Sequence, residues 1–417
     1  MQERRRAPYT VRPRTALITR GFDPQLSVGS ARPAVFRSST YVFKSPESAE
    51  RAFALALGKS ELVAGESPDL IYARLSHPNA EILEDHVVTL EPDAQAAAVF
   101  NSGMAAISTI FMTLCRPGSS FVTTTPVYGG TQHFMNQLLA GLGIRGVGVP
   151  AGDTAGLRRA IADAKDLRLV FVETPANPTL QMADIRAVVE SARARVPAPV
   201  VAVDNTFLGP VFQHPIRLGA DLSVYSATKY LAGFSDMLGG VVLGRDPELV
   251  DVLRGTRGLL GNILQPDECW LLDSRLPTVA LRMNRQSKNA MRIVEALARH
   301  PNVLKMHHPS LFDDAEQVRI RDAQTRFPGA MLSLRVAGGK AGAFDFLRRL
   351  RVARIAVSLG AIETLACHPA STTHSEMSRE DQVAAGITDD LVRISVGIED
   401  WRDILRDFRE ALDAVRP

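Results

Sequence analysis

Between residues 97 and 243, short apolar runs alternate with longer amphipathic segments. The runs that predict strands are 97–100, 121–125, 167–173, 200–204, 222–226 and 241–243, with a weaker one at 145–149. The segments that predict helices between them include 103–114, 133–140 and 183–194. Strands that are apolar on both faces and joined by helices indicate an α/β fold with a mostly parallel sheet, covered on both faces. Ligands of such sheets bind beyond the carboxyl ends of the strands, so reactive residues are sought there.

The chain has 417 residues, which is long enough for more than one domain. Residues 1–62 predict an extended N-terminal arm with one helix at 45–57, in which Ser45 is the N-cap and Pro46 lies in the first turn. Residues 63–265 carry the alternating pattern. Residues 266–417 predict a smaller α+β C-terminal domain that starts with a helical stretch at 267–297 and ends with a helix at 401–415. The arginines and prolines of the first residues predict a solvated tail, not a transit peptide or a secretory signal.

Composition excludes several classes of protein. The formal net charge is only +3, which argues against binding of nucleic acid through a broad basic field. No apolar run approaches the ~18 residues of a membrane-spanning helix, so no membrane partner is expected. The three cysteines are far apart and form no CxxC, which indicates neither a disulfide framework nor a zinc ribbon and fits the cytoplasm. The neighbouring pairs 307–308 and 367–368 lack the spacing of metal ligands, so no metal is expected.

A Gly-x-Gly-x-x-Gly motif occurs at Gly141, Gly143 and Gly146. A dinucleotide site would need a strand before this motif and a helix after it. Here the predicted order is the reverse, so the motif is interpreted as an ordinary connection from a helix to a strand.

Lys229 follows the predicted strand 222–226 directly and precedes an apolar turn that contains glycine. An ammonium group is costly to bury at the end of an apolar strand unless it has a function. A lysine with a lowered pKa in a dry pocket can form a Schiff base with a carbonyl cofactor. A lysine on a solvated helix face is the commoner case, and the spacing alone leaves the structural and the functional interpretation open.

Other strand ends supply groups that suit the same cofactor. Asp204 could be a turn residue, or it could hold the protonated ring nitrogen of pyridoxal phosphate. Residues 101–104 open a helix whose backbone N–H groups suit a phosphate, to which Ser226 and Thr228 can add hydroxyls. Tyr128 could stack on a cofactor ring. Together these residues indicate a pyridoxal phosphate site.

Five blocks of the chain now resemble one family. They are Ser-Ala-Thr-Lys-Tyr at 226–230, Val-Asp-Asn-Thr-Phe at 203–207, Asn-Ser-Gly-Met-Ala-Ala at 101–106, Glu-Thr-Pro-Ala-Asn-Pro-Thr at 173–179 and Val-Arg-Ile-Ser-Val-Gly-Ile-Glu-Asp at 392–400. The sequence resembles the Cys/Met-metabolism family of pyridoxal-phosphate enzymes from about residue 15 to 415. This resemblance implies the type I fold of pyridoxal-phosphate transferases and the cofactor pyridoxal 5'-phosphate.

The resemblance also implies a role for each site residue. Lys229 would form the Schiff base, Asp204 would bind the ring nitrogen, and Tyr128 would stack and transfer protons. The phosphate would be bound by Gly103, Met104, Ser226 and Thr228, and by Tyr72 and Arg74 of a neighbouring subunit. Asn177 would contact the cofactor and the substrate carboxylate, Arg393 would bind that carboxylate bidentately, and Ser358 would line the same end. The implied assembly is a homotetramer built from dimers with shared active sites, in which the arm 1–62 contacts the neighbouring subunit.

The family's reactions are γ-elimination and γ-replacement on a small amino-acid substrate. Val357 stands before Ser-Leu-Gly where cystathionine enzymes commonly carry Glu, which favours an uncharged γ-substituent. Three positions depart from methionine γ-lyases, namely Gly130, residues 257–259 and residues 77–79. We therefore expect γ-elimination on an uncharged γ-substituted L-amino acid, with γ-replacement on an O-acylhomoserine as the alternative. A pseudoenzyme would lack Lys229, Asp204 or Arg393, and all three are present.

Overall fold

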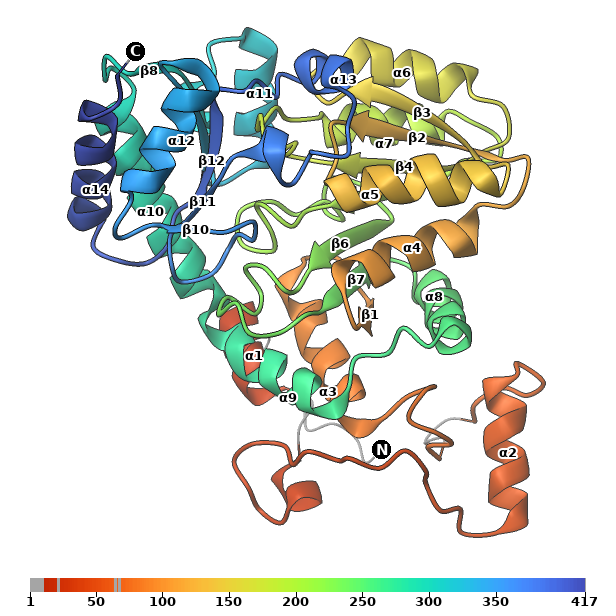
Figure 1. Ribbon diagram of the computed structural model, residues 1–417. Coiled ribbons are helices and arrows are strands. Elements are labelled where there is room, and N and C mark those ends of the chain that lie inside the picture. Colours follow the sequence, from red (N-terminus) through yellow and green to blue (C-terminus); the bar gives the residue numbers. More distant parts are fainter. Residues whose placement is uncertain (1–10, 21–22, 64–65, 67–68, 417) are drawn as a thin grey trace.

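The computed structural model describes residues 11–20, 23–63, 66 and 69–416, and Figure 1 shows its two sheets and the N-terminal arm. The larger sheet has seven strands in the order β1-β7-β6-β5-β4-β2-β3. These strands are β1 Ala96–Phe100, β2 Ser120–Thr125, β3 Arg145–Pro150, β4 Leu167–Glu173, β5 Val200–Asp204, β6 Leu222–Ser226 and β7 Gly240–Gly244. Each run that the sequence pattern predicted as a strand is therefore confirmed.

The larger sheet is mostly parallel, as predicted. Its exception is β7, which pairs antiparallel with both β1 and β6. Periodicity could not show this, because a strand buried on both faces has the same apolar pattern in either direction. The carboxyl ends of the other strands meet at one edge, where Asp204 and Glu173 are register partners.

Helices cover both faces of the larger sheet. One face packs against α4 Gly103–Leu114, α8 Pro247–Leu260, and a helix that runs from α5 Gly129–His133 into a π-helical turn η3 Phe134–Leu139. The other face packs against α6 Thr154–Asp163 and α7 Ile185–Arg193, and near β1 and β7 against α3 Pro78–Val87 and α9 Pro266–Arg275. A short turn η2 Val88–Leu90 follows α3. The motif Gly141–Gly146 starts after η3 and ends inside β3, so it is the connection from a helix to a strand that the sequence predicts.

The second sheet has five strands in the order β10-β11-β12-β9-β8. They are β8 Val303–His307, β9 Met331–Val336, β10 Arg354–Ile355, β11 Leu365–Cys367 and β12 Leu391–Ser395. The sheet shares a core with α10 Val279–Leu297, α12 Gly339–Arg349 and α14 Trp401–Asp413. The turns η4 Leu276–Thr278, η5 Pro309–Leu311 and η6 Pro369–Ser371 and the helices α11 Ala315–Gln324 and α13 Arg379–Ala384 complete this part. The helical stretch predicted at 267–297 is thus α9 and α10, joined by η4.

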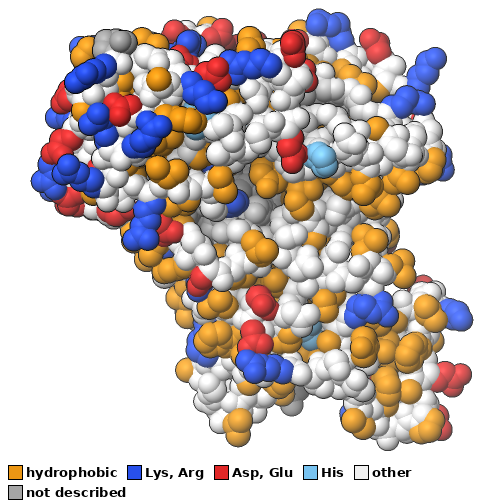
Figure 2. Space-filling view, in the orientation of Figure 1, with side chains coloured by type: hydrophobic (Ala, Val, Ile, Leu, Met, Phe, Trp, Pro, Cys, Tyr) orange, Lys and Arg blue, Asp and Glu red, His pale blue; other side chains and the backbone are white. Residues whose placement is uncertain are grey.

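The N-terminal part extends from the body of the molecule (Figure 1). It contains α1 Pro13–Thr19, the turn η1 Pro24–Ser27 and α2 Pro46–Ala56, so the arm holds one short helix more than predicted. Ser45 caps α2, as expected, by accepting the backbone N–H of Ser48. Hydrophobic side chains gather over α2 in Figure 2, and Phe53, Leu57 and Val42 are exposed. The solvated tail predicted for residues 1–8 lies outside the described residues. None of the described helices is long and apolar enough to cross a membrane.

Candidate active site

One cavity at the carboxyl edge of the larger sheet collects most of the predicted site residues. The predicted residues that line it come from strand ends, the start of α4 and the second sheet, and they are Gly103, Met104, Tyr128, Asn177, Asp204, Ser226, Thr228, Lys229 and Arg393. Ser358 adjoins it through a hydrogen bond to Lys229. The cavity is therefore built from segments up to 290 residues apart, which the parallel strands bring to one edge.

The start of α4 lies against the end of β6. Ser102 caps α4 and accepts the backbone N–H of Ala105. A Cβ atom on Gly103 would lie 2.9 Å from Cβ of Ser226, so only glycine permits this close approach. The first N–H groups of α4 and the hydroxyls of Ser226 and Thr228 consequently converge on one end of the cavity, a donor set that suits a phosphate group.

Two buried carboxyl groups lie side by side on the floor of the site. Asp204 ends β5, and its Oδ1 accepts the hydroxyl of Thr206 at 2.6 Å and the backbone N–H of Thr206 at 3.0 Å. Glu173 ends β4 beside it. Burial raises the pKa of Asp204, and burial together with the Asp204 carboxylate raises the pKa of Glu173 well above its ordinary value. A protonated ring nitrogen would be a suitable partner for the Asp204 carboxylate, because it would compensate a buried negative charge.

Lys229 carries an amine of unusual acidity. Its Nζ donates a hydrogen bond to Oγ of Ser358 at 3.0 Å. Burial, and then the nearby Arg393 cation, lower its pKa to about 8. A fraction of the amine is therefore neutral near pH 7, which is the form that attacks carbonyl carbon and accepts protons.

Arg393 lies on β12 and reaches from the second sheet into the cavity. Its Nη1 donates to Oδ1 of Asn177 at 3.1 Å, and its Nη2 donates to the carbonyl oxygens of Val357 and Ser358 at 2.7 and 3.2 Å. Its side chain is buried. Within the described ranges no carboxylate forms an ion pair with it, so its charge is available for an anionic ligand.

Tyr128 lies beside this cavity with its ring half exposed, whereas Tyr72 and Arg74 do not line it. Arg74 donates from Nη1 to the carbonyl oxygen of Gly258 at 2.5 Å, and its guanidinium lies 6.0 Å from the centre of the Tyr72 ring. Their role toward the phosphate of a neighbouring subunit therefore stays a prediction.

Sequence reasoning missed two polar residues of the site. Glu173 and Thr206 line the cavity, and Thr206 also accepts the backbone N–H of Ser226 at 2.9 Å. The signal that could have found them is their position, because Glu173 ends β4 and Thr206 follows β5 by two residues. Leu238, Leu359 and Val357 add an apolar wall.

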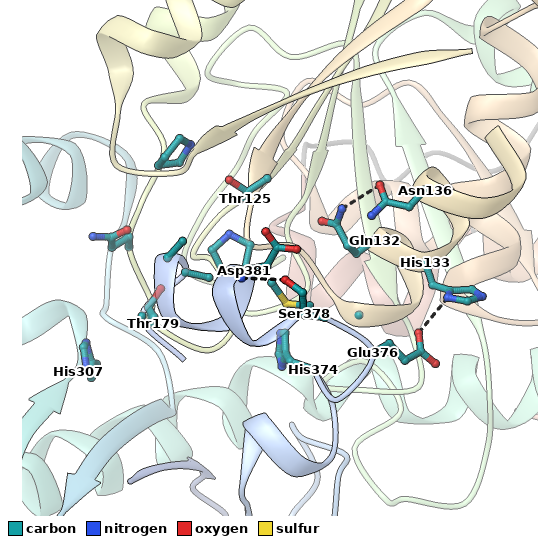
Figure 3. Close-up of a pocket in the computed structure, with 18 of the residues that line it drawn as sticks. Thr125, Gln132, His133, Asn136, Thr179, His307, His374, Glu376, Ser378 and Asp381 are labelled. Carbon is teal, nitrogen blue, oxygen red and sulfur yellow. Dashed lines mark hydrogen bonds and ion pairs between the residues drawn. The ribbon is translucent and has the colours of Figure 1, made fainter. Parts of the chain in front are cut away.

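A larger cavity lies elsewhere between the two sheets, and Figure 3 shows side chains that line it, among them Gln132, Asp381 and His374. None of the predicted site residues lines this cavity. Burial and the Arg393 cation lower the pKa of His374 to about 4, so its imidazole is neutral near pH 7. No group of His, Cys, Asp and Glu side chains suited to a metal ion occurs among the residues described.

The donor set as a whole fits pyridoxal phosphate. The start of α4 with Ser226 and Thr228 would hold the phosphate, Asp204 the ring nitrogen and Lys229 the carbonyl carbon. Arg393 and Asn177 remain for the carboxylate of an amino acid. Each group of the cofactor thus meets a chemically matched partner from this chain.

Comparison with known proteins agrees with this geometry. The family described as "Cys/Met metabolism PLP-dependent enzyme" matches residues 14–413. An L-methionine gamma-lyase of Fusobacterium nucleatum is 38% identical over 93% of this chain and 94% of its own length. An O-succinylhomoserine sulfhydrylase of Pseudomonas aeruginosa is 34% identical over 93% and 92%. The crystal structure of a cystathionine gamma synthase from Xanthomonas oryzae superposes with a TM-score of 0.87, at 32% identity over 98% of both chains. The predicted family, fold and cofactor are confirmed: this chain belongs to the pyridoxal-phosphate-dependent enzymes of Cys/Met metabolism.

Proposed function

We propose that this chain catalyses γ-elimination on an L-amino acid with an uncharged γ-substituent, such as methionine, and releases a 2-oxo acid, ammonia and the leaving group. The observation that carries the proposal is the lining of the cavity: the buried Arg393 has no carboxylate partner among the described residues, and the apolar side chains of Leu238, Val357 and Leu359 line the same cavity. The similarity to L-methionine gamma-lyases supports the same reaction.

The cationic end would bind the α-carboxylate of the substrate. Arg393 has N–H donors left after its bonds to Asn177, Val357 and Ser358, and its planar fork matches a carboxylate. Because Asn177 and the 357–358 segment already orient the guanidinium, little side-chain entropy is lost on binding. The substrate's Cα would then lie near Lys229.

Lys229 would carry the protons of the reaction. Bound pyridoxal phosphate supplies an electron sink for the negative charge left when a proton departs from Cα. The lowered pKa of Lys229, about 8, lets Nζ accept this proton and return it at another carbon. Ser358 holds Nζ at the edge of the site through the 3.0 Å hydrogen bond. Tyr128, with its ring half exposed beside the cavity, would assist proton transfer at the substrate amine.

The γ-substituent would face Val357, Leu238 and Leu359. The ionisable residues among those lining the cavity, apart from Tyr128, are Glu173, Asp204, Lys229 and Arg393, and each has a partner in the scheme above or in the protein. A distal zwitterion, as in cystathionine, therefore finds no free charged partner among the described residues that line this cavity. An uncharged thioether would lose no hydrogen bonds there.

γ-Replacement is the alternative, since the two reactions share their early steps and the similarity to an O-succinylhomoserine sulfhydrylase supports it. The deciding experiment measures 2-oxobutanoate release from methionine, homocysteine, O-acetylhomoserine and a γ-halo amino acid, each with and without added thiol. Release without thiol supports γ-elimination. Suppression of release by thiol, with a new thioether amino acid, supports γ-replacement.

A substitution of the apolar wall tests the substrate class. Val357→Glu should lower kcat/KM for methionine by about tenfold, because a carboxylate facing an uncharged thioether costs on the order of 1–2 kcal/mol. The same variant should gain relative activity toward cystathionine. Val383→Glu, an exposed valine outside the cavity, is the control. Unchanged preference in Val357→Glu would contradict the assigned wall.

We further propose that the working enzyme is a homotetramer of dimers with shared active sites, located in the cytoplasm. Tyr72 and Arg74 do not line the cavity of their own chain, and the arm 1–62 exposes Phe53, Leu57 and Val42, as a surface covered by another subunit would. All three cysteines are buried and free, which fits a reducing compartment. Sedimentation equilibrium tests the assembly, and mixing of Tyr72→Phe with Lys229→Ala subunits tests the sharing: restored activity would require sites built from two chains.

A further inference from the structure

Glu173 lies in the centre of the site, but the proposed reaction assigns it no role. It ends β4, between the ends of β2 and β5, its neighbours in the sheet. Its side chain lines the cavity and is 5% exposed. A buried carboxyl group at this edge is costly, so its contacts should reveal what it does.

The contacts of Glu173 go to backbone on both sides. Its Oε2 accepts the N–H of Tyr128 at 2.7 Å, and the backbone N–H of Asn177 lies near enough to the carboxyl group to act on its pKa. Tyr128 lies in the loop that leaves β2, and Asn177 lies in the loop that leaves β4. One carboxyl group thus joins the two loops that present the stacking tyrosine and the partner of Arg393.

Tyr128 has few other restraints. Its ring is half exposed, and over the stretch of chain that the structure describes no hydrogen bond holds its hydroxyl. The ring lies close to the backbone of Gly130, where a Cβ atom would lie 2.7 Å from Cε1 of the ring. The direction of the ring therefore depends on the backbone at residue 128, which Glu173 holds.

We propose that Glu173 is a positioning residue: by accepting the backbone N–H of Tyr128 and facing the backbone N–H of Asn177, it sets the tyrosine ring and the asparagine amide relative to the cofactor and Arg393. It acts through these residues and does not touch the reacting atoms. This inference rests on the proposed function only for its kinetic test. The position of the tyrosine ring beside the cofactor can be measured separately, by the circular dichroism of the bound cofactor.

The protonation state of Glu173 determines which substitution should preserve its hydrogen bonds. Burial and the adjacent Asp204 carboxylate raise its pKa well above the ordinary value, which favours the neutral acid. A neutral carboxyl accepts N–H bonds through its carbonyl oxygen, and so does the amide of glutamine. Glu173→Gln should therefore preserve the function, whereas Glu173→Asp is one methylene too short to reach Tyr128.

The experiment compares Glu173→Gln, Glu173→Asp and Glu173→Ala with the native enzyme, all loaded with pyridoxal phosphate. We expect Glu173→Ala and Glu173→Asp to lower kcat/KM about 10- to 100-fold, since displacement of a site group by about 1 Å has an effect of this size. In both variants the circular dichroism of the bound cofactor should change, because the ring beside it has moved. Glu173→Gln should stay within about threefold of native activity and keep the native dichroism.

Glu91 provides a matched control. It is also buried and accepts a backbone N–H, from Ile216 at 3.1 Å, and the hydroxyl of Tyr225 at 2.7 Å, but it does not line the cavity. Glu91→Gln and Glu91→Asp should lower the midpoint of thermal unfolding and leave the cofactor dichroism unchanged. The proposal is overturned if Glu173→Asp or Glu173→Ala keeps native dichroism and kcat/KM, or if Glu173→Gln loses as much as Glu173→Ala. Should Glu173→Ala fail to fold, Glu173→Asp carries the test. Altered dichroism without turnover of any tested amino acid would place the fault in the proposed reaction instead.

Discussion

The two ends of the site are built in different ways. The phosphate end, at Gly103, Ser226 and Thr228, belongs entirely to the larger sheet and its first covering helix. The carboxylate end needs Arg393 from β12 and the 357–358 segment, both from the part of the chain that forms the second sheet. The difference is that this chain's own groups at the cofactor end come from one sheet and its covering helix, whereas the substrate end needs groups from both sheets.

Lys229 lies where the two ends meet, so its loss should have the largest effect. Lys229→Ala removes the amine that we propose binds the cofactor and carries protons, and we expect 2-oxo acid release to fall by about 10²- to 10⁴-fold or more. Lys288→Ala, an exposed lysine on α10, is the control and should retain native activity. Undiminished turnover by Lys229→Ala would remove this residue from the mechanism.

The carboxylate end can be weakened by itself. Arg393→Lys keeps the charge but loses the bidentate fork, and charge-assisted hydrogen bonds are worth about 1.5–3 kcal/mol, so kcat/KM should fall about 10- to 100-fold. Affinity for pyridoxal phosphate should stay within about twofold. Arg335→Lys, an arginine on β9 that pairs with Asp390 outside the site, is the matched control. Equal losses of cofactor and substrate affinity in Arg393→Lys would mean that the two ends are not separable.

A substitution at the phosphate end should weaken binding of the cofactor more than binding of the substrate. Gly103→Ala would place Cβ 2.9 Å from Cβ of Ser226, and the strain should weaken binding of pyridoxal phosphate to the cofactor-free enzyme by about tenfold. KM for the amino acid, measured with saturating cofactor, should change less. Titration by fluorescence measures the cofactor affinity. Gly141→Ala, which has open space around its Cβ position, should bind the cofactor like the native chain.

The smallest effect concerns pH. Burial lowers the pKa of Lys229 from 10.5 to about 8, so between these values the unfolded chain keeps a proton that the folded, cofactor-free enzyme has lost. Folding is therefore favoured increasingly as the pH rises through this window. Relative to Lys229→Met, the native chain should gain on the order of 1 kcal/mol in free energy of unfolding between about pH 8 and about pH 10. Denaturant unfolding at the two pH values measures it, and a Lys288→Met control should show no such gain. A gain shared by Lys229→Met would assign the effect to other groups.

The sequence predicted which strand-end residues of the larger sheet meet at one cavity, because strand ends are local features. Asp204, Ser226 and Lys229 each end or follow an apolar run, and parallel strands bring such ends to one edge. The resemblance to a family supplied Arg393 and Asn177, which lie 216 residues apart and meet only through packing of the two sheets. Periodicity could not have paired them.

Other features could not be predicted for physical reasons. Glu173 has the same local pattern as any acidic residue that ends a strand, and its contacts to two loops depend on tertiary structure. The antiparallel direction of β7 leaves no trace in an apolar pattern. The π-helical turn of η3, within a helix predicted as regular, depends on hydrogen-bond registers that side-chain periodicity does not report.

The hydrogen bonds that orient Arg393 have a consequence for which molecules the site excludes. Neutral acceptors from Asn177, Val357 and Ser358 orient the guanidinium but leave its charge uncompensated in a buried place. A decarboxylated amine could reach Lys229, yet it would leave this buried cation without an anion, which costs several kcal/mol relative to the amino acid. The cell's pool of biogenic amines should therefore neither occupy nor inhibit the site, although each carries the amino group on which the cofactor acts.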